Sequence, residues 1–131
     1  MKQMHILFVD DESTIAEYVP EYLEMKGYKV TAFSDSEKAL EWFGENQNVV
    51  DVVITDHFMP KVTGLDLAKL VHKAKPEMPI FICSGNVHAL DGLWKEAGIR
   101  NLFVKPYDLD TLIKILKQAM PEPGEALNAP A

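Results

Sequence analysis

Short apolar runs alternate with amphipathic stretches along most of this chain. A short apolar run bounded by polar or turn residues is typical of a buried strand, and apolar residues spaced three and four apart are typical of a helix. The runs predict strands at residues 6–9, 29–33, 49–55, 79–83 and 102–104. Because a helical stretch follows each strand, we expect an α/β protein with a doubly wound, five-stranded parallel sheet and helices on both faces.

The spacing of apolar residues within the helical stretches predicts which side chains face the sheet. The predicted inner residues are Ile15, Val19, Tyr22, Leu23 and Met25 in the first helix; Ala39, Leu40 and Phe43 in the second; Leu67, Leu70 and Val71 in the third; Val87, Leu90, Trp94 and Ala97 in the fourth; and Leu109, Leu112, Ile113, Leu116 and Met120 in the last. Ser34 or Ser36 is expected to cap the second helix, and Pro20 to kink or loosen the first. We expect residues 1–120 to form one domain and residues 121–131, with three prolines, to form a flexible tail or the start of a linker.

Polar side chains stand where the predicted strands end. Asp10 and Asp11 follow the first strand, Asp56 the third, Ser84 the fourth and Lys105 the fifth. The carboxyl ends of parallel strands open on one edge of a sheet, where such folds bind ligands. Each residue alone has a simpler interpretation: the paired acids as helix caps, Asp56 and Ser84 as turn residues, and Lys105 as a solvated lysine. Their convergence on one edge favours a shared site.

The residue types at this edge indicate phosphoryl chemistry. Three adjacent carboxylates repel one another, and a hard divalent cation such as Mg²⁺ (or Mn²⁺) relieves that repulsion with oxygen ligands. A carboxylate can attack phosphorus to form an aspartyl phosphate, while a cation and an ammonium group neutralise phosphoryl charge. Asp56 is the best nucleophile candidate, because its strand is predicted to be central and Asp10 and Asp11 are paired for the metal.

Composition narrows the possible partners. The chain has 131 residues with 13 Lys and Arg against 20 Asp and Glu, a net charge of −7. Such an acidic domain repels nucleic-acid phosphates and anionic lipid, so we expect no direct nucleic-acid binding and no membrane binding. The single cysteine, Cys83, excludes an intrachain disulfide and a cysteine-based zinc site. No apolar run approaches the length of a membrane span and no signal peptide is recognisable, so a cytoplasmic location is expected.

Four segments resemble the receiver domain of two-component response regulators. They are Phe8-Val9-Asp10-Asp11-Glu12; Ile54-Thr55-Asp56-His57-Phe58-Met59-Pro60 with Gly64 after it; Cys83-Ser84-Gly85; and Val104-Lys105-Pro106. Their order and spacing are similar to the family over residues 4–119. The resemblance implies a flavodoxin-like (βα)₅ fold with strand order 2-1-3-4-5.

The resemblance also implies a role for each site residue. Asp56 would accept a phosphoryl group from a histidine kinase or a histidine phosphotransfer domain. Asp11, assisted by Asp10, would bind the metal together with Asp56 and the backbone carbonyl of Phe58. Ser84 and Lys105 would contact the phosphoryl oxygens. The domain would then be a signalling switch that catalyses only its own phosphoryl transfer and autodephosphorylation. Its downstream effector would read the face made by the helix after residue 86, the strand at 102–104 and the last helix.

Several positions depart from the family pattern or invite a second interpretation. Leu102 stands where the family usually has an aromatic residue that swings inward on activation. Gly85 replaces the usual alanine and is expected to loosen its loop. Phe58 is apolar and could restrict an attacking water molecule. His57, next to the expected acceptor, is interpreted as a solvated loop residue rather than as a phosphate carrier.

Three other function classes remain as alternatives. A phosphohydrolase of the haloacid dehalogenase kind also uses an aspartate at a strand end, but it needs a second acid two residues later, where this chain has Phe58. A nucleotide-binding module would need a glycine-rich loop after the first strand. A degenerate receiver that serves only as a docking surface would not need all five site residues. The chain could stand alone or belong to a longer regulator or hybrid kinase.

Overall fold

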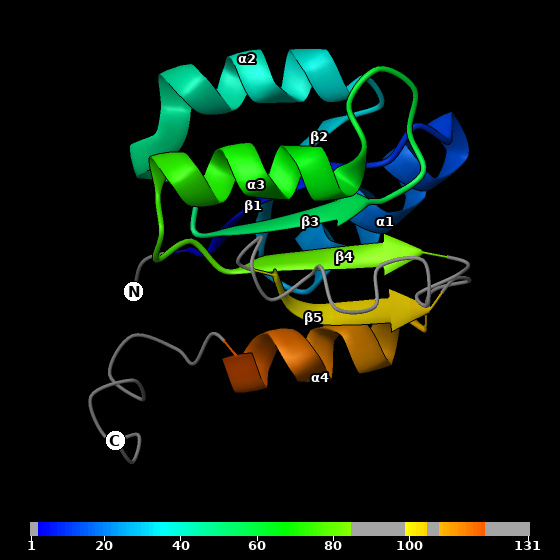
Figure 1. Cartoon of the computed structure of the whole chain (residues 1–131). Helices are drawn as coiled ribbons and strands as arrows, with labels where there is room; N and C mark the ends of the chain where they lie inside the picture. Colours follow the sequence, from blue (N-terminus) through cyan, green and yellow to red (C-terminus); the bar gives the residue numbers. More distant parts are fainter. Residues whose placement is uncertain (1–2, 85–98, 105–107, 120–131) are drawn as a thin grey trace.

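The computed structural model describes residues 3–84, 99–104 and 108–119 of the chain (Figure 1). Its strands are β1 (His5–Val9), β2 (Lys29–Phe33), β3 (Val52–Asp56), β4 (Ile80–Ser84) and β5 (Ile99–Val104). Its described helices are α1 (Ser13–Met25), α2 (Ser36–Asn46), α3 (Gly64–Ala74) and α4 (Leu109–Ala119), with a 3₁₀ turn η1 (Gln47–Val49). The strands form one parallel sheet in the order β2-β1-β3-β4-β5, which confirms the flavodoxin-like order expected from the sequence.

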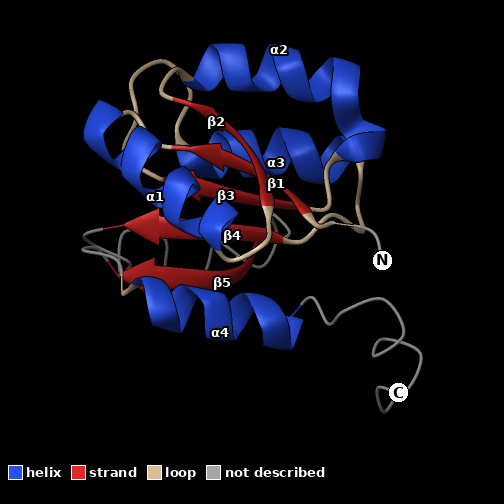
Figure 2. Ribbon diagram, turned by 180° about the vertical axis from the view of Figure 1, so that it is seen from behind, coloured by secondary structure: helices blue, strands red, loops and turns tan. Residues whose placement is uncertain are grey.

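Helices cover both faces of this sheet. Helices α2 and α3 lie on one side, and α1 and α4 lie on the other (Figures 1 and 2). Successive side chains of a strand point to opposite faces. Leu7 and Val9 therefore belong to the apolar cluster beneath α2 and α3, while Ile6 and Phe8 belong to the cluster beneath α1 and α4. All four are fully buried, as a central strand of a doubly wound sheet requires.

Strand boundaries agree with the sequence prediction to within one residue except at two starts. The third strand was expected to begin at Val49, but Val49 lies in η1 and its side chain is 47% exposed. Asp51 precedes the observed start, and its carboxylate accepts a hydrogen bond from the His5 N–H at 2.8 Å, at the beginning of β1. Strand β5 begins at Ile99, earlier than the predicted 102.

The predicted helix faces are confirmed for the most deeply buried positions, such as Val19, Leu23, Leu67, Leu112 and Leu116. Two predictions are wrong, because Met25 is 77% exposed and Leu70 is 51% exposed. Met25 is the last residue of α1, at the turn into β2. Leu70 is about 100° around the helix from its buried neighbour Val71, so it points past the sheet. The predicted inner positions Val87, Leu90, Trp94, Ala97 and Met120 lie outside the described residues.

The cap of the second helix was also predicted wrongly. The N-cap is Asp35, whose carboxylate accepts hydrogen bonds from the N–H groups of Glu37 at 2.9 Å and Lys38 at 3.2 Å. Aspartate caps as well as serine does, and Asp35 stands between the two serines that were considered. Ser36, the first residue of α2, uses its hydroxyl in another way, described below.

Within the described ranges, the helices are too short or too polar to cross a bilayer.

Candidate functional site

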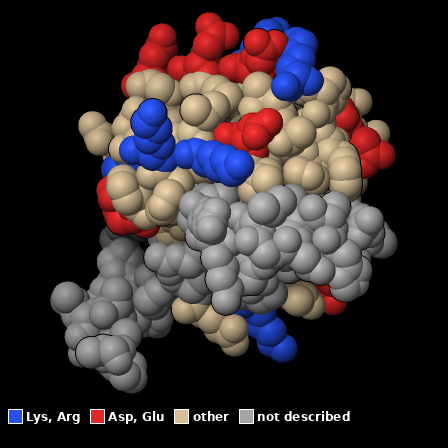
Figure 3. Space-filling view, in the orientation of Figure 1, with Lys and Arg blue, Asp and Glu red and all other residues tan. Residues whose placement is uncertain are grey.

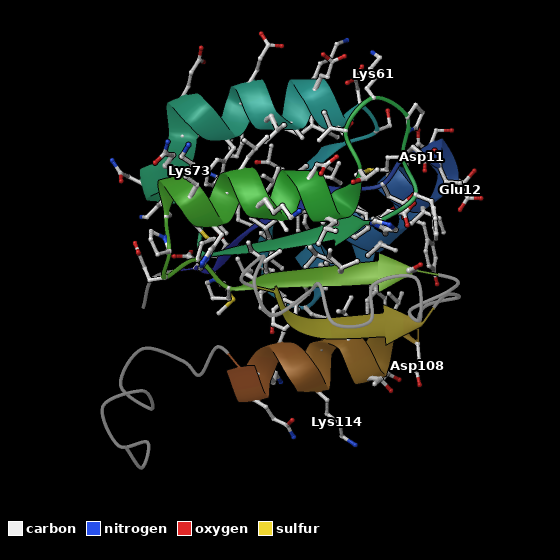
Figure 4. The ribbon with its side chains drawn as sticks, viewed as in Figure 1. Asp11, Glu12, Lys61, Lys73, Asp108 and Lys114 are labelled. Carbon is white, nitrogen blue, oxygen red and sulfur yellow. The ribbon has the colours of Figure 1, made fainter. Side chains whose placement is uncertain are left out.

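Three carboxylates meet at the carboxyl edge of the sheet. Oxygen atoms of Asp10, Asp11 and Asp56 all lie within 4.8 Å of one another. The register explains the meeting, because Val9 of β1 pairs with Thr55 of β3 and the aspartates come next on both strands. Asp10 is fully buried, Asp56 is 5% exposed and Asp11 is exposed. Figure 4 shows Asp11 at the end of the sheet toward which the strand arrows point.

Backbone hydrogen bonds fix the two buried carboxylates. The N–H of Glu12 donates to Oδ1 of Asp10 at 3.0 Å, and the N–H of His57 donates to Oδ1 of Asp56 at 2.9 Å. The N–H of Asp10 donates to the carbonyl of Phe33 at 3.1 Å, which ties β1 to the end of β2. Because backbone groups orient both carboxylates, their positions are set by the sheet before any ligand binds.

Gly64 packs directly behind Asp56. A Cβ atom at this position would lie 2.7 Å from Cα of His57, 2.9 Å from the carbonyl carbon of Asp56, and closer still to the Asp56 carbonyl oxygen. The Gly64 N–H donates to the carbonyl of His57 at 2.8 Å. Only glycine allows α3 to begin this close to the strand that carries Asp56. Gly64 belongs to the motif of residues 54–64, but the sequence alone gives no physical reason for a glycine there.

His57 is not the solvated loop residue that was expected. Its Nδ1 accepts a hydrogen bond from the Leu65 N–H at 3.4 Å, in the first turn of α3. Its ring packs edge-on against Phe58, with centroids 4.7 Å apart. Partial burial lowers the pKa of His57 below its usual 6.5, and the nearby Asp66 offsets only part of that effect. The imidazole is therefore neutral near pH 7 and helps to cap α3, while the Phe58 side chain remains 55% exposed.

The structure describes only some of the remaining site residues. Ser84 is fully buried at the end of β4, one residue beyond Cys83, which pairs with Asp56. Lys105 follows the last residue of β5 and lies outside the described residues, as does Gly85. Leu102 lies in β5 opposite Ile82, and the account of its side chain remains a prediction. The carbonyl of Phe58 belongs to the loop at the same edge, and its role as a metal ligand also stays a prediction.

The donor set suits a hard divalent cation. Mg²⁺ is held in proteins by one to a few carboxylate oxygens together with water molecules, and it requires oxygen ligands in nearly octahedral geometry. The cluster offers three carboxylates, two of them buried and oriented, and one exposed on the solvent side. Without a cation these like charges would repel one another.

The comparisons with known proteins identify the family. A model of the response regulator receiver domain matches residues 6–117, so the chain belongs to that family. Receiver domains are signalling domains, and this chain is a phosphorylation-dependent switch of that class.

Individual relatives share about a third of the sequence. The DNA-binding transcriptional regulator NtrC of Bradyrhizobium is 30% identical over 127 residues, which are 96% of this chain and 26% of that protein. The two-component response regulator ORR11 of rice is 31% identical over 89% of this chain and 81% of that protein. This chain spans about a quarter of the length of the NtrC relatives, 26% in Bradyrhizobium and 24% in Rhizobium meliloti.

Solved structures of receivers superpose closely. A response regulator receiver domain from Clostridium thermocellum has a TM-score of 0.85 at 32% identity, covering 96% of this chain and 99% of that one. The response regulator TrrA of Thermotoga maritima, in complex with Mg²⁺ and BeF, has a TM-score of 0.79 at 29% identity, covering 90% of this chain and 100% of that one.

Proposed function

We propose that Asp56 is the phosphoryl acceptor of this receiver domain. The observation that carries the proposal is the meeting of Asp56 with Asp10 and Asp11 at the end of the central strand β3. The donor is a phosphohistidine of a histidine kinase or phosphotransfer domain. A carboxylate oxygen of Asp56 forms a bond to phosphorus while the phosphorus–nitrogen bond of the donor breaks, and the leaving imidazole keeps the electron pair and takes up a proton.

Asp10, Asp11 and Asp56 would hold Mg²⁺, with the backbone carbonyl of Phe58 as a further oxygen ligand. Mn²⁺, which also prefers oxygen ligands, would suit the same set. When bound, the cation neutralises charge on the phosphoryl oxygens. The Mg²⁺ and BeF complex of TrrA supports this assignment. Within this chain, the backbone of His57 holds Asp56 in place, and Ser84 and Lys105 are proposed to contact the phosphoryl oxygens.

The domain acts on its own aspartate and not on a separate substrate. We propose that it catalyses only its own phosphoryl transfer and autodephosphorylation. Its effector would read the face that includes segment 85–98, β5 and α4. The acidic surface, visible as Asp and Glu side chains along α2 in Figure 3, supports protein partners rather than nucleic acid or membrane. The proposed location is the cytoplasm, and the proposed domain is residues 1–120 with a tail or linker from 121.

A stable phosphoryl mimic tests the site as a whole. Beryllium fluoride added with Mg²⁺ is expected to shift the amide resonances of Asp10, Asp11, His57 and Ser84 in the wild-type protein. Neither component alone is expected to produce the full set of shifts, because the fluoride complex needs both the carboxylate and the cation. Spectra that stay unchanged with both components present would overturn the proposal.

A further inference from the structure

The amino end of α2 holds the loop that follows Asp56. The hydroxyl of Ser36 donates to the carbonyl of Pro60 at 3.1 Å and accepts from the N–H of Val62 at 3.3 Å. One side chain therefore joins two backbone groups of the loop between β3 and α3 to α2. The Val62 N–H is shared, because it also donates to the Pro60 carbonyl at 2.8 Å across the three-residue turn at Lys61. Ser36 is 3% exposed, so its partners cannot exchange this contact freely for water.

Exposed ion pairs also join this loop to the start of α2. Between Pro60 and Val62, Lys61 adopts a left-handed backbone with φ of 71°, which is uncommon for a residue other than glycine. Its Nζ lies 3.2 Å from Asp35 and 3.4 Å from Glu37, at the start of α2. Figure 4 shows Lys61 at the crest of the loop, beside α2. These ion pairs are exposed and contribute little, so of the polar contacts between α2 and the loop the buried hydroxyl of Ser36 constrains the loop most.

The loop is thus fixed at three places. The His57 N–H and carbonyl hold its beginning, the Gly64 N–H and Thr63 hold its end, and Ser36 holds its middle. Phe58, whose carbonyl is the proposed fourth metal ligand, lies between the first and the second of these places. Met59 and Val62 also pack against the apolar cluster beneath α2 and α3. Apolar packing has no fixed direction, so the two hydrogen bonds of Ser36 are what orient the backbone of residues 60–62 on that cluster.

We propose that Ser36 is a positioning residue for the metal site. Its hydroxyl selects one conformation of residues 58–62 and so presents the Phe58 carbonyl to the carboxylates of Asp10, Asp11 and Asp56. This inference rests on the proposed function, which supplies the metal. Residues that orient metal ligands typically change affinity by about tenfold or more when removed. Because Ser36 acts on one backbone ligand of several, we expect a loss of about five- to tenfold in Mg²⁺ affinity.

Three variants of the full chain test this role. Ser36→Ala removes one oxygen atom and both hydrogen bonds. Asn46→Ala is the matched control, because it removes a side-chain hydrogen bond to the Trp42 carbonyl, 2.8 Å long, at the opposite end of the same helix. Lys61→Ala removes only the exposed ion pairs and is expected to change affinity less than about twofold.

Two measurements separate positioning from general stability. A Mg²⁺ titration followed by amide shifts gives the affinity, and hydrogen exchange in metal-free buffer reports the order of residues 58–63. We expect Ser36→Ala to weaken Mg²⁺ binding and to speed exchange at Val62, because the Val62 N–H then keeps only its bond to the Pro60 carbonyl within the turn. Asn46→Ala should change neither. Wild-type affinity and exchange in Ser36→Ala would overturn the inference, as would equal weakening by Asn46→Ala. If the wild type itself binds no Mg²⁺, the proposed function fails, and exchange at Val62 alone decides the inference.

Discussion

Replacing Gly64 with alanine tests how closely α3 approaches the strand that carries Asp56. The added methyl group would meet the carbonyl of Asp56 and Cα of His57, the latter at 2.7 Å. Ordinary carbon–carbon contacts lie at about 3.5–4.0 Å. All the atoms that the methyl group meets belong to the backbone, so no side chain can rotate to make room. Either the start of α3 or the end of β3 must move.

The expected destabilisation is large for one methyl group. Overpacking a well-packed site costs about 1–3 kcal/mol, and the rigid backbone on one side places Gly64→Ala near the upper end, at about 3 kcal/mol. Small domains unfold with about 5–15 kcal/mol, so the variant still folds. Displacing the end of β3 also moves the Asp56 carboxylate, so we expect weaker Mg²⁺ binding in the folded variant.

The other glycines of the described chain supply matched controls. Gly44 lies in α2 with open space at its Cβ position, so Gly44→Ala should stabilise the protein by about 0.5–1 kcal/mol through helix propensity. Gly27 also has open space, but its φ of 99° disfavours a side chain. Gly27→Ala should cost about 1–2 kcal/mol without affecting Mg²⁺ binding, since Gly27 precedes β2 at the opposite edge of the sheet.

Urea denaturation of the wild type and the three variants gives their free energies of unfolding. A Mg²⁺ titration followed by amide shifts gives their Mg²⁺ affinities. We expect the order Gly44→Ala, wild type, Gly27→Ala and Gly64→Ala, from most to least stable. A Gly64→Ala protein within about 0.5 kcal/mol of the wild type, the usual range for an unconstrained surface change, would refute the close approach. Equal loss of Mg²⁺ affinity in Gly27→Ala and Gly64→Ala would refute the link to Asp56.

Three further substitutions test the site and its surroundings. Asp11→Ala should weaken Mg²⁺ binding yet raise the free energy of unfolding in metal-free buffer, because one of three like charges is removed; unchanged affinity in the titration would argue against Asp11 as a ligand. Ser84→Ala should still be phosphorylated but show smaller activation shifts at the end of β4, and wild-type shifts would mean that the hydroxyl is not the link. Hydrogen bonding from the Lys38 N–H, and then from Lys61, lowers the pKa of Asp35 below 3.8. This contribution to stability is present above pH 3.8 and is lost as the pH falls through the lowered pKa in the folded protein. Asp35→Asn should therefore make the free energy of unfolding less dependent on pH below about pH 4, and an unchanged acid limb in denaturation curves would contradict that reasoning.

The fold could be predicted from the sequence because the central strands β1, β3 and β4 are buried on both faces and so form short apolar runs. The strand predicted at 29–33 has the same bounds as β2, and the strand predicted at 79–83 differs from β4 by one residue at each end. Val49 misled the prediction, because an apolar residue in a 3₁₀ turn resembles the first residue of a strand. Leu70 misled it because a helix that covers a sheet buries only part of its surface.

Only those parts of the site that lie directly at the ends of strands could be predicted from the sequence. The meeting of Asp10, Asp11 and Asp56 follows from parallel register, and the structure brings them together. The roles of Ser36 and His57 could not be predicted, because each bonds to backbone atoms of a loop or helix start whose path the sequence does not specify. A serine beside a helix start is usually a cap, and here the preceding aspartate takes that role.

Phosphoryl labelling of Asp56 tests the central claim most directly. The wild-type protein and Asp56→Asn, which keeps the size of the side chain but removes the nucleophile, are incubated with acetyl phosphate and Mg²⁺ and analysed by intact mass. We expect the wild type to gain one acid-labile phosphoryl group, omission of Mg²⁺ to prevent the gain, and Asp56→Asn to stay unmodified while folded. Labelling of Asp56→Asn at the wild-type level would contradict the assignment of Asp56 as the acceptor.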